Sequence, residues 1–182
     1  TTMPKNEPKH IESSIRDNRD RGTIGDFLTN DIKPHSKLSF VSAYFTIFAY
    51  QHLKANLDEI DSLRFLFGEP AFIKSLVGEN ENKRSMEILD DALSVQIQER
   101  LSQKSAAIDC AEWIRAKAEI RSMVKPNFLH GKLYMIENAH GLKQGIAGSS
   151  NFTVNGLGLG GSPNMELNLV VNDKRDLADL EG

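Results

Sequence analysis

Hydrophobic residues recur along this chain at two spacings, one typical of helices and one of strands. Apolar positions at three- and four-residue steps predict helices over residues 23–32, 46–57, 72–77, 88–101 and 106–117. Short runs dense in aliphatic and aromatic residues predict strands over residues 38–43, 63–67, 120–124, 128–136, 144–149 and 166–171. The first two strands and the helix between them indicate a parallel βαβ unit. The pattern therefore predicts an α/β fold, a mixed β-sheet flanked by helices on both faces.

Three segments depart from this pattern. Residues 1–20 are polar and mixed in charge, which predicts a flexible N-terminal arm with a short helix over residues 11–19. We assign residues 21–182 to one domain, whose charged tail ends without a stop signal, as in a fragment of a longer protein. The glycine-rich run 156–161 lacks the Gly-Lys-Ser/Thr ending of a nucleotide-binding loop. It is either a mobile loop at the mouth of a cleft or a tight packing turn.

Composition narrows the possible functions. With 40% hydrophobic and 26% charged residues, the 182-residue chain suits one globular domain with its own core. A formal net charge of −3 argues against broad coating of nucleic acid, but a local basic site acts over only about 8–10 Å. The single cysteine, Cys110, excludes an internal disulfide and a multi-cysteine metal site, and its helical spacing predicts a buried thiol. Without a signal peptide or a membrane-spanning apolar run, we expect a cytoplasmic protein with no membrane contact.

Residues that could take part in catalysis lie on the predicted strand 128–136 and on the turn after the next strand. His130 and Lys132 would share one face of the strand, about 6–7 Å apart along it. If the two strands are neighbours, Ser149 and Asn151 lie close to His130 and Lys132. The four side chains then offer hydrogen-bond donors for a phosphate and one group, the imidazole, that could attack it. Each part also has a plainer interpretation: a structural histidine, a solvated lysine at an edge, and an ordinary turn.

Together these residues resemble the signature of the phospholipase D superfamily, which is His-x-Lys, an acidic residue five positions later, and Gly-Ser-x-Asn. The residues that carry it here are His130, Lys132, Glu137, Gly148, Ser149 and Asn151. Glu137 stands where the superfamily usually has Asp, and the spacer before Gly148 is longer than usual. Its extra residues, 138–141, predict a hairpin turn. Farther on, the pattern Asn164-x-Glu166-x-Asn168 resembles the superfamily's acidic partner that holds the catalytic histidine.

The resemblance implies one half of the bilobal phospholipase D body and metal-independent cleavage of a phosphodiester. His130 would attack the phosphorus and form a phosphohistidine, while Glu166 would fix the tautomer of its imidazole. Lys132, Ser149 and Asn151 would bind the phosphate oxygens. No metal or other cofactor is expected.

A leaving oxygen also needs an acid, and the chain has a single His-x-Lys motif. The superfamily pattern implies a second His130 from a twofold-related subunit, which predicts a homodimer with the site at its interface. His140 is the alternative within one chain, but it lies on the predicted turn. Glu137 and Ser150 complete the candidate site as supporting residues.

Residues 37–46 and 110–115 resemble the phospholipase-D-like domain at the N-terminus of certain bacterial SWI/SNF-type helicases, a resemblance that runs from about residue 21 to residue 171. It implies that the substrate is DNA or another phosphodiester and that a helicase motor belongs to the full-length chain. Two alternatives stay open. One is a catalytically idle DNA-binding or dimerisation module of the same fold. The other is a phospholipase, which the lack of an amphipathic membrane-facing segment argues against.

Overall fold

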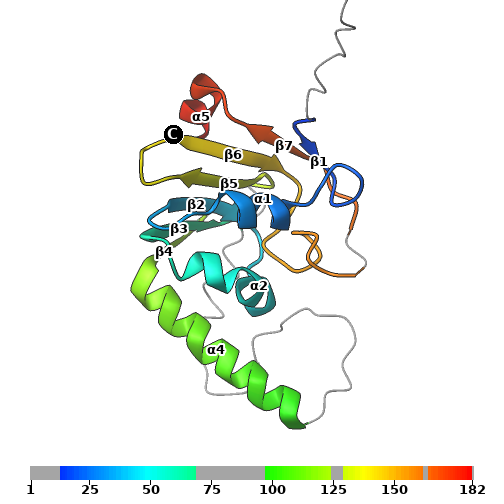
Figure 1. Cartoon of the computed structure of the whole chain (residues 1–182), viewed down its shortest axis with the longest axis vertical. Helices are drawn as coiled ribbons and strands as arrows, with labels where there is room; N and C mark the ends of the chain where they lie inside the picture. The colour runs from blue at the N-terminus through cyan, green and yellow to red at the C-terminus, as the bar shows by residue number, and fades with distance from the viewer. Residues whose placement is uncertain (1–12, 69–96, 124–128, 162–163, 182) are drawn as a thin grey trace, which may run out of the picture.

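Within the described residues, one seven-stranded sheet forms the body of the protein (Figure 1). The computed structural model describes residues 13–68, 97–123, 129–161 and 164–181. In their order across the sheet, the strands are β1 (Ile15–Arg16), β7 (Asn168–Val171), β6 (Lys143–Gly148), β5 (Lys132–Glu137), β2 (Lys37–Ser42), β3 (Ser62–Phe67) and β4 (Ala118–Ser122). β2, β3 and β4 pair in parallel and the other neighbours pair antiparallel, so the sheet is mixed.

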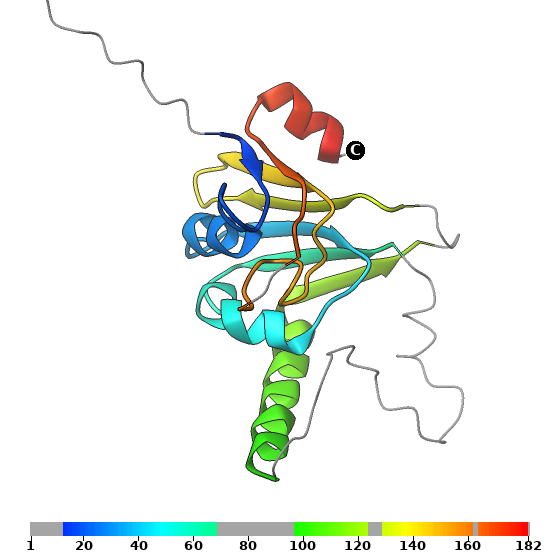
Figure 2. The same cartoon turned by 90° about the vertical axis from the view of Figure 1, so that its right-hand side faces the viewer.

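Helices lie on both faces of this sheet. Three of them contribute to the main core on one face; they are α1 (Ile24–Asp31), α2 (Ile47–Leu57) and α4 (Ile97–Lys117). α5 (Lys174–Glu181) lies on the other face, where its buried Leu177 packs against Gly145 of β6. Figure 2 shows α1 (blue) and α2 (cyan) together beside the sheet and α5 (red) apart from them. The predicted α/β class, with a mixed sheet and helices on both faces, is confirmed.

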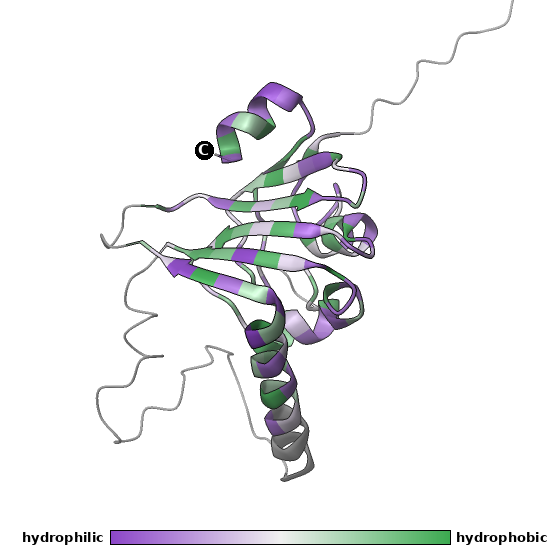
Figure 3. Ribbon diagram, turned by 90° about the vertical axis from the view of Figure 1, so that its left-hand side faces the viewer, coloured by the Kyte–Doolittle hydropathy of each residue, from purple (hydrophilic) through white to green (hydrophobic). Residues whose placement is uncertain are grey.

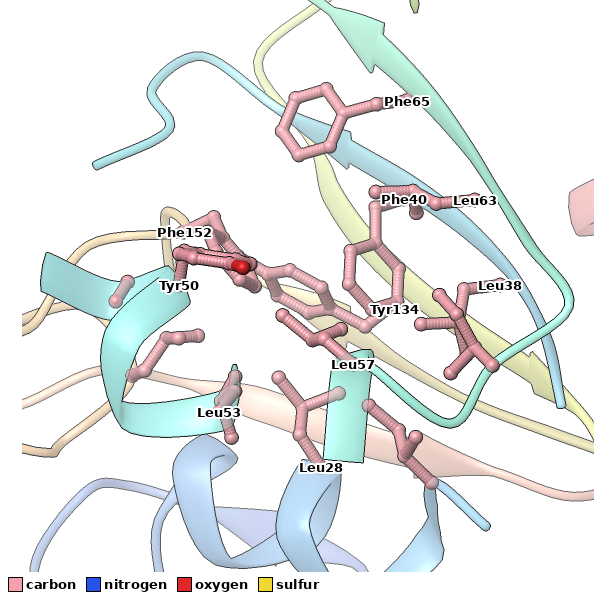
Figure 4. Close-up of a cluster of buried hydrophobic side chains, with 14 of the residues drawn as sticks. Leu28, Leu38, Phe40, Tyr50, Leu53, Leu57, Leu63, Phe65, Tyr134 and Phe152 are labelled. Atoms are coloured by element: carbon pink, nitrogen blue, oxygen red, sulfur yellow. The ribbon is translucent and has the colours of Figure 1, made fainter. Parts of the chain in front are cut away.

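Polar and apolar residues alternate along the strands (Figure 3), and this alternation decides which face is buried. Leu38 and Phe40 of β2 are buried together with the residues opposite them on β5, Ile136 and Tyr134. Phe152, from the segment after β6, packs among these rings (Figure 4), with its centroid 5.8 Å from Phe40 and 6.3 Å from Tyr134. The turn directly before Phe152, which carries the Gly-Ser-Ser-Asn motif, is therefore anchored in the core.

Capping residues place the first two helices where the sequence predicts them. The hydroxyl of Thr23 accepts a hydrogen bond from the main-chain N–H of Asp26 at 2.9 Å. The hydroxyl of Thr46 accepts one from the N–H of Ala49 at 3.3 Å. Both contacts satisfy N–H groups that have no partner inside the helix. The predicted parallel βαβ unit is also confirmed, since β2 and β3 are parallel neighbours joined by α2.

Two turns rely on glycine. The predicted hairpin between β5 and β6 is present, and Gly141 adopts a φ of 76° there, which glycine tolerates without strain. In the glycine-rich run, Leu157 is fully buried and its carbonyl accepts a hydrogen bond from the N–H of Gly25 at 2.7 Å. Gly158 follows with a φ of 72°. Of the two interpretations of this run, the packing turn is the one that the structure supports at residues 156–158.

The N-terminal region differs from its prediction. The helix expected over residues 11–19 is wrong for the part described, because Ile15–Arg16 form β1 and pair antiparallel with β7. Ladder hydrogen bonds to β7 outweigh the weak helical pattern of this short segment. Asp17 and Asn18, which follow, are buried. Residues 13–20, assigned from sequence to the flexible arm, thus contribute to the sheet and its surroundings; residues 1–12 lie outside the described residues.

Two element boundaries differ by more than two residues from those predicted. Residues 97–117 form one helix rather than ending one helix at residue 101 and starting another at 106, since residues 102–105 contain no Gly or Pro to stop it. β5 begins at Lys132 rather than at residue 128, because its partner β6 ends at Gly148, directly opposite Lys132. His130 therefore precedes the strand. The helix predicted over 72–77 and the first part of that over 88–101 lie outside the described residues.

Asp17 provides a test of the N-terminal packing. Its carboxylate accepts hydrogen bonds from the main-chain N–H groups of Arg21 at 3.0 Å and Arg19 at 2.9 Å, which hold its pKa below the usual 3.8. A lowered folded-state pKa gives stability that is present above the unfolded-state pKa and is lost as the pH falls through the folded-state pKa. We expect Asp17→Asn to lower the free energy of unfolding at pH 7, with the deficit shrinking below about pH 4.

Chemical denaturation of Asp17→Asn and of the exposed control Asp20→Asn, each from pH 3 to pH 7, measures this difference. A deficit for Asp17→Asn that stayed constant over this range would contradict the role assigned to the carboxylate.

Cys110 provides a test of the packing of α4. The predicted buried thiol is confirmed, with 2% of the residue exposed, and burial raises its pKa to about 12. Since the thiolate is the reactive form, we expect iodoacetamide at pH 8 to label Cys110 only after unfolding. An Asp109→Cys variant, with a thiol at the neighbouring exposed position, should be labelled in the folded state. Equal labelling rates at the two positions in folded protein would show that α4 does not pack with Cys110 facing the core.

Candidate active site

Four strand ends meet at one end of the sheet. β2 ends at Ser42, β5 begins at Lys132, β6 ends at Gly148 and β7 begins at Asn168. The register places Lys132 opposite Gly148 and Gly148 opposite Asn168, while Val41 of β2 lies opposite Leu133. The predicted site residues outside the strands follow or precede these ends within a few positions; they are His130, Ser149, Asn151 and Glu166. Pairing of the strands therefore brings the two motif segments to the same end, as the sequence predicts for neighbouring strands.

The side chain of Lys132 contacts the main chain of His130. The two residues do not share a face of one strand, because His130 precedes β5. The half-buried Lys132 lies on the face of β5 that also carries Tyr134, and its ammonium donates a hydrogen bond to the carbonyl of His130 at 2.6 Å. The imidazole of His130 is exposed. An ammonium group has three donors, so this contact leaves Lys132 able to bind an anion beside His130.

Asn151 has a defined side-chain orientation. Its Oδ1 atom accepts hydrogen bonds from the hydroxyl of Ser42 at 3.2 Å and from the main-chain N–H of Ala43 at 3.1 Å. These donors occupy the two acceptor positions of the amide oxygen, so the Nδ2 amino group remains available as a donor. Both contacts come from the end of β2, a part of the sequence in which we had predicted no site residue.

Ser149 is tied to Glu166. Its hydroxyl donates a short hydrogen bond to the Glu166 carboxylate and accepts one from the main-chain N–H of Leu167 at 3.1 Å. The N–H of Ser149 in turn donates to the carbonyl of Leu167 at 3.2 Å. The described contact of the Glu166 side chain is thus with Ser149, and its pairing with His130 stays a prediction. These bonds extend the pairing of β6 and β7 beyond the last ladder residues.

Ser150 points into the protein and holds the turn from inside. Its N–H donates to Oδ1 of Asn168 at 3.3 Å, and its hydroxyl accepts from Nδ2 of Asn168 at 3.0 Å. Its carbonyl accepts from the hydroxyl of Tyr134 at 2.7 Å. Burial raises the pKa of Tyr134 and outweighs the opposite effect of its contact with the hydroxyl of Ser42, which keeps the phenol protonated as a donor. Tyr134 and Asn168 thus fix the turn.

Gly148 permits the close approach of β6 and β7 at this point. A Cβ atom there would lie 2.7 Å from Cα of Asn168 and would also overlap the carbonyl of Leu167. Any side chain would separate the strands just where Ser149 and Ser150 make their contacts with β7. The glycine of the motif is therefore required by packing.

Glu137 and His140 lie away from this end. Glu137 closes β5, about 17 Å of strand from Lys132 by the rise per residue, and its carboxylate is 3.6 Å from the ammonium of Lys143. His140 lies on the exposed hairpin turn after it. The alternative in which His140 of the same chain protonates the leaving group is therefore wrong. Glu137, where the superfamily usually has Asp, thus belongs to an ion pair at the far end of the sheet.

Sequence reasoning missed Ser42, Ala43, Tyr134 and Asn168 as residues that shape the site. Only Asn168 left a signal, because it belongs to the Asn-x-Glu-x-Asn pattern around Glu166. Ser42 is 109 residues from Asn151 in the sequence, so no local spacing connects them.

Among the described residues, no group of three or more His, Cys, Asp or Glu side chains could hold a metal ion. No helix in that part of the chain is long and apolar enough to cross a membrane.

Comparison with known families agrees with this geometry. The model of the family described as "Cardiolipin synthase, PLD-like domain" matches residues 50–181. The match covers well over half of the chain, including both motif segments and the strands β5, β6 and β7 that position them. A comparison with curated proteins finds no match. The chain therefore belongs to the phospholipase-D-like family, and with it to the phospholipase D superfamily that its motif residues resemble.

Proposed function

We propose that residues 21–182 form a metal-independent phosphodiesterase domain of the nuclease type. It acts on DNA through a phosphohistidine intermediate, as the N-terminal part of an ATP-dependent helicase. The observation that carries the chemistry is the meeting of His130, Lys132 and the fixed amide of Asn151 at one end of the sheet. Family membership supports the reaction class, phosphodiester chemistry. The helicase context rests on the resemblance of residues 37–46 and 110–115 alone.

In the first step, a ring nitrogen of His130 attacks the phosphorus. The nitrogen–phosphorus bond forms as the bond to the leaving oxygen breaks, and the leaving oxygen takes a proton from an acid. In the second step, the conjugate base of that acid takes a proton from water, the water oxygen adds to the phosphorus, and the nitrogen–phosphorus bond breaks. This step releases a phosphomonoester and returns a neutral His130. The exposed position of His130 just before β5 leaves its ring accessible for both steps.

Charge on the phosphoryl oxygens is met by two donors that the fold fixes in place. The ammonium of Lys132 is held beside His130, and Nδ2 of Asn151 is left over once Oδ1 is bonded to the end of β2. Preorganised donors of this kind each lower a barrier by on the order of 3–4 kcal/mol. Because Lys132 supplies the positive charge, the proposal assigns no role to a metal ion.

Ser149 takes a different role from the one expected. Its hydroxyl proton is directed at Glu166, so we assign Ser149 to hold the carboxylate rather than to bind phosphate. Glu166 remains the proposed partner of His130, and it would keep the imidazole in the tautomer that attacks. Tyr134 and Ser150 support the same turn from inside the protein.

The acid for the leaving group comes from a second subunit in this proposal. Within the described residues, the motif contributes one imidazole, that of His130, and His140 lies at the other end of β5. A homodimer whose twofold axis passes near the motif would place a second His130 on the far side of the phosphate, where the leaving oxygen departs. Each imidazole could then attack or donate a proton.

A second candidate function is a catalytically idle module of the same fold that binds DNA or dimerises the motor. The observation that favours it is that the Glu166 carboxylate is engaged by Ser149 in the structure. An idle module tolerates the loss of His130, whereas an enzyme that uses a phosphohistidine does not. A phospholipase is the third reading, and a phosphatidylcholine substrate distinguishes it from a nuclease.

The decisive assay follows cleavage of bis(p-nitrophenyl) phosphate, single-stranded DNA and phosphatidylcholine vesicles in the presence of EDTA. We expect cleavage of the first two, unaffected by EDTA, and its fall to background in His130→Ala, because the nucleophile is removed. His140→Ala is the matched control and should keep full activity. Cleavage that survives in His130→Ala would contradict the mechanism. Inactivity of the wild type on every substrate would favour the idle module.

Oligomeric state tests the second imidazole. We expect light scattering coupled to gel filtration to give twice the chain mass of 20.3 kDa. Mixing wild type with excess His130→Ala should lower activity more than simple dilution does, because mixed dimers carry one imidazole. A fully active monomer would exclude a site shared between subunits.

A further inference from the structure

The end of β2 carries a buried hydroxyl with more contacts than one serine needs for packing. Ser42 is fully buried, and its Oγ atom accepts hydrogen bonds from the N–H of Phe152 at 3.0 Å and of Tyr44 at 3.4 Å. Its single proton has two acceptors in reach, Oδ1 of Asn151 at 3.2 Å and the carbonyl of Tyr44 at 2.8 Å. Ser42 thus contacts the side chain of Asn151 and the main chain of Phe152.

The neighbouring N–H decides which way the Asn151 amide faces. The main-chain nitrogen of Ala43 can only donate, and it lies 3.1 Å from the side-chain atom assigned as Oδ1 of Asn151. Turning the amide over would set two donors against each other at that distance, so the oxygen must face β2. The Nδ2 amino group then faces away from β2.

Packing holds the main chain of Asn151 from the opposite side. A Cβ atom on Gly156 would lie 2.9 Å from the nitrogen of Asn151 and would overlap its carbonyl, so the two backbones are in direct contact. The carbonyl of Phe152 accepts from the N–H of Thr46 at 3.0 Å, which ties the same turn to the start of α2. Asn151 therefore has little freedom except rotation of its side chain, and Ser42 and Ala43 restrict that rotation.

We propose that Ser42 is a positioning residue that aims the amino group of Asn151 at the substrate phosphate. This inference rests on the proposed function, in which Asn151 is a phosphate donor. It adds that the orientation of this donor, Nδ2 of Asn151, is fixed by the C-terminal end of β2, a segment outside the motif. Ser42 acts through Asn151 and does not itself contact substrate.

A hydroxyl that acts in this way gives a particular kinetic result. Ser42→Ala removes the hydroxyl proton that Oδ1 of Asn151 shares with the carbonyl of Tyr44, so Nδ2 spends less time aimed at the phosphate. We expect kcat to fall roughly three- to tenfold with KM nearly unchanged, as for the loss of one ordinary hydrogen bond. Asn151→Ala should lower kcat by on the order of 10²–10³-fold. Ser42→Ala should have no further effect in the Asn151→Ala background, because the group it positions is gone.

The matched control is Ser36→Ala. Ser36 is also a fully buried serine, and its hydroxyl accepts a hydrogen bond from the N–H of Lys33 at 3.1 Å just before β2 begins, at the other end of the sheet. Its loss removes a comparable contact without touching Asn151, so kcat should stay at the wild-type value. Ser42→Cys, which retains a weak donor in nearly the same space, should fall between wild type and Ser42→Ala and serves if Ser42→Ala does not fold.

A binding measurement separates this inference from the proposed function. Titration with inorganic phosphate should shift the side-chain amide signal of Asn151 in NMR spectra, and the Ser42 variants should need more phosphate for the same shift. If Asn151→Ala loses activity but the effects of Ser42→Ala and Asn151→Ala multiply, Ser42 acts elsewhere and this inference is wrong. If Asn151→Ala is fully active or the wild type cleaves nothing, the proposed function fails and takes the inference with it.

Discussion

Antiparallel pairing of β5 with β2 on one side and β6 on the other is the constraint on which the candidate site depends. It sets the end of β2, the start of β5 and the end of β6 side by side, and β7 joins them through Gly148. The polar residues of the turn after β6 meet partners from two other strands. Ser149 meets Glu166 and Ser150 meets Asn168, both at or just before the start of β7, while Asn151 meets Ser42 and Ala43 at the end of β2. The turn is thus held from both sides, with Phe152 buried behind it.

The two ends of the sheet carry different kinds of contact. At the motif end, the hydrogen bonds leave donors of Lys132 and Asn151 available to an anion. At the far end, opposite charges neutralise one another, since Lys143 is 2.6 Å from Glu181 and 3.6 Å from Glu137. Glu137, which stands where the superfamily usually has aspartate, belongs to the ion pairs of the far end. The formal net charge of −3 likewise says little about a site whose charges are set locally.

Much of the fold could be predicted from the sequence because its signals are local. Thr23 and Thr46 mark helix starts, the alternation in β2 and β3 marks strands, and Gly141 marks the hairpin. β1 could not, because two residues gain their strand conformation only from pairing with β7, which lies some 150 residues later. The start of β5 was predicted too early for the same reason, because β5 begins opposite the last residue of its partner β6. The strand pairing brings His130, Lys132, Ser149 and Asn151 to one end of the sheet, as predicted from the sequence, but the contacts of the turn depend on long-range partners such as Ser42.

In the proposed function, Lys132 and Asn151 hold a phosphoryl group between them with His130 beside it. Capture of the covalent intermediate tests that account most directly. A reaction with a phosphodiester, quenched in alkali within milliseconds and analysed by mass spectrometry of peptides, should carry a phosphoryl adduct on His130. Rapid cleavage without any adduct on His130, or with the adduct on another residue, would contradict it.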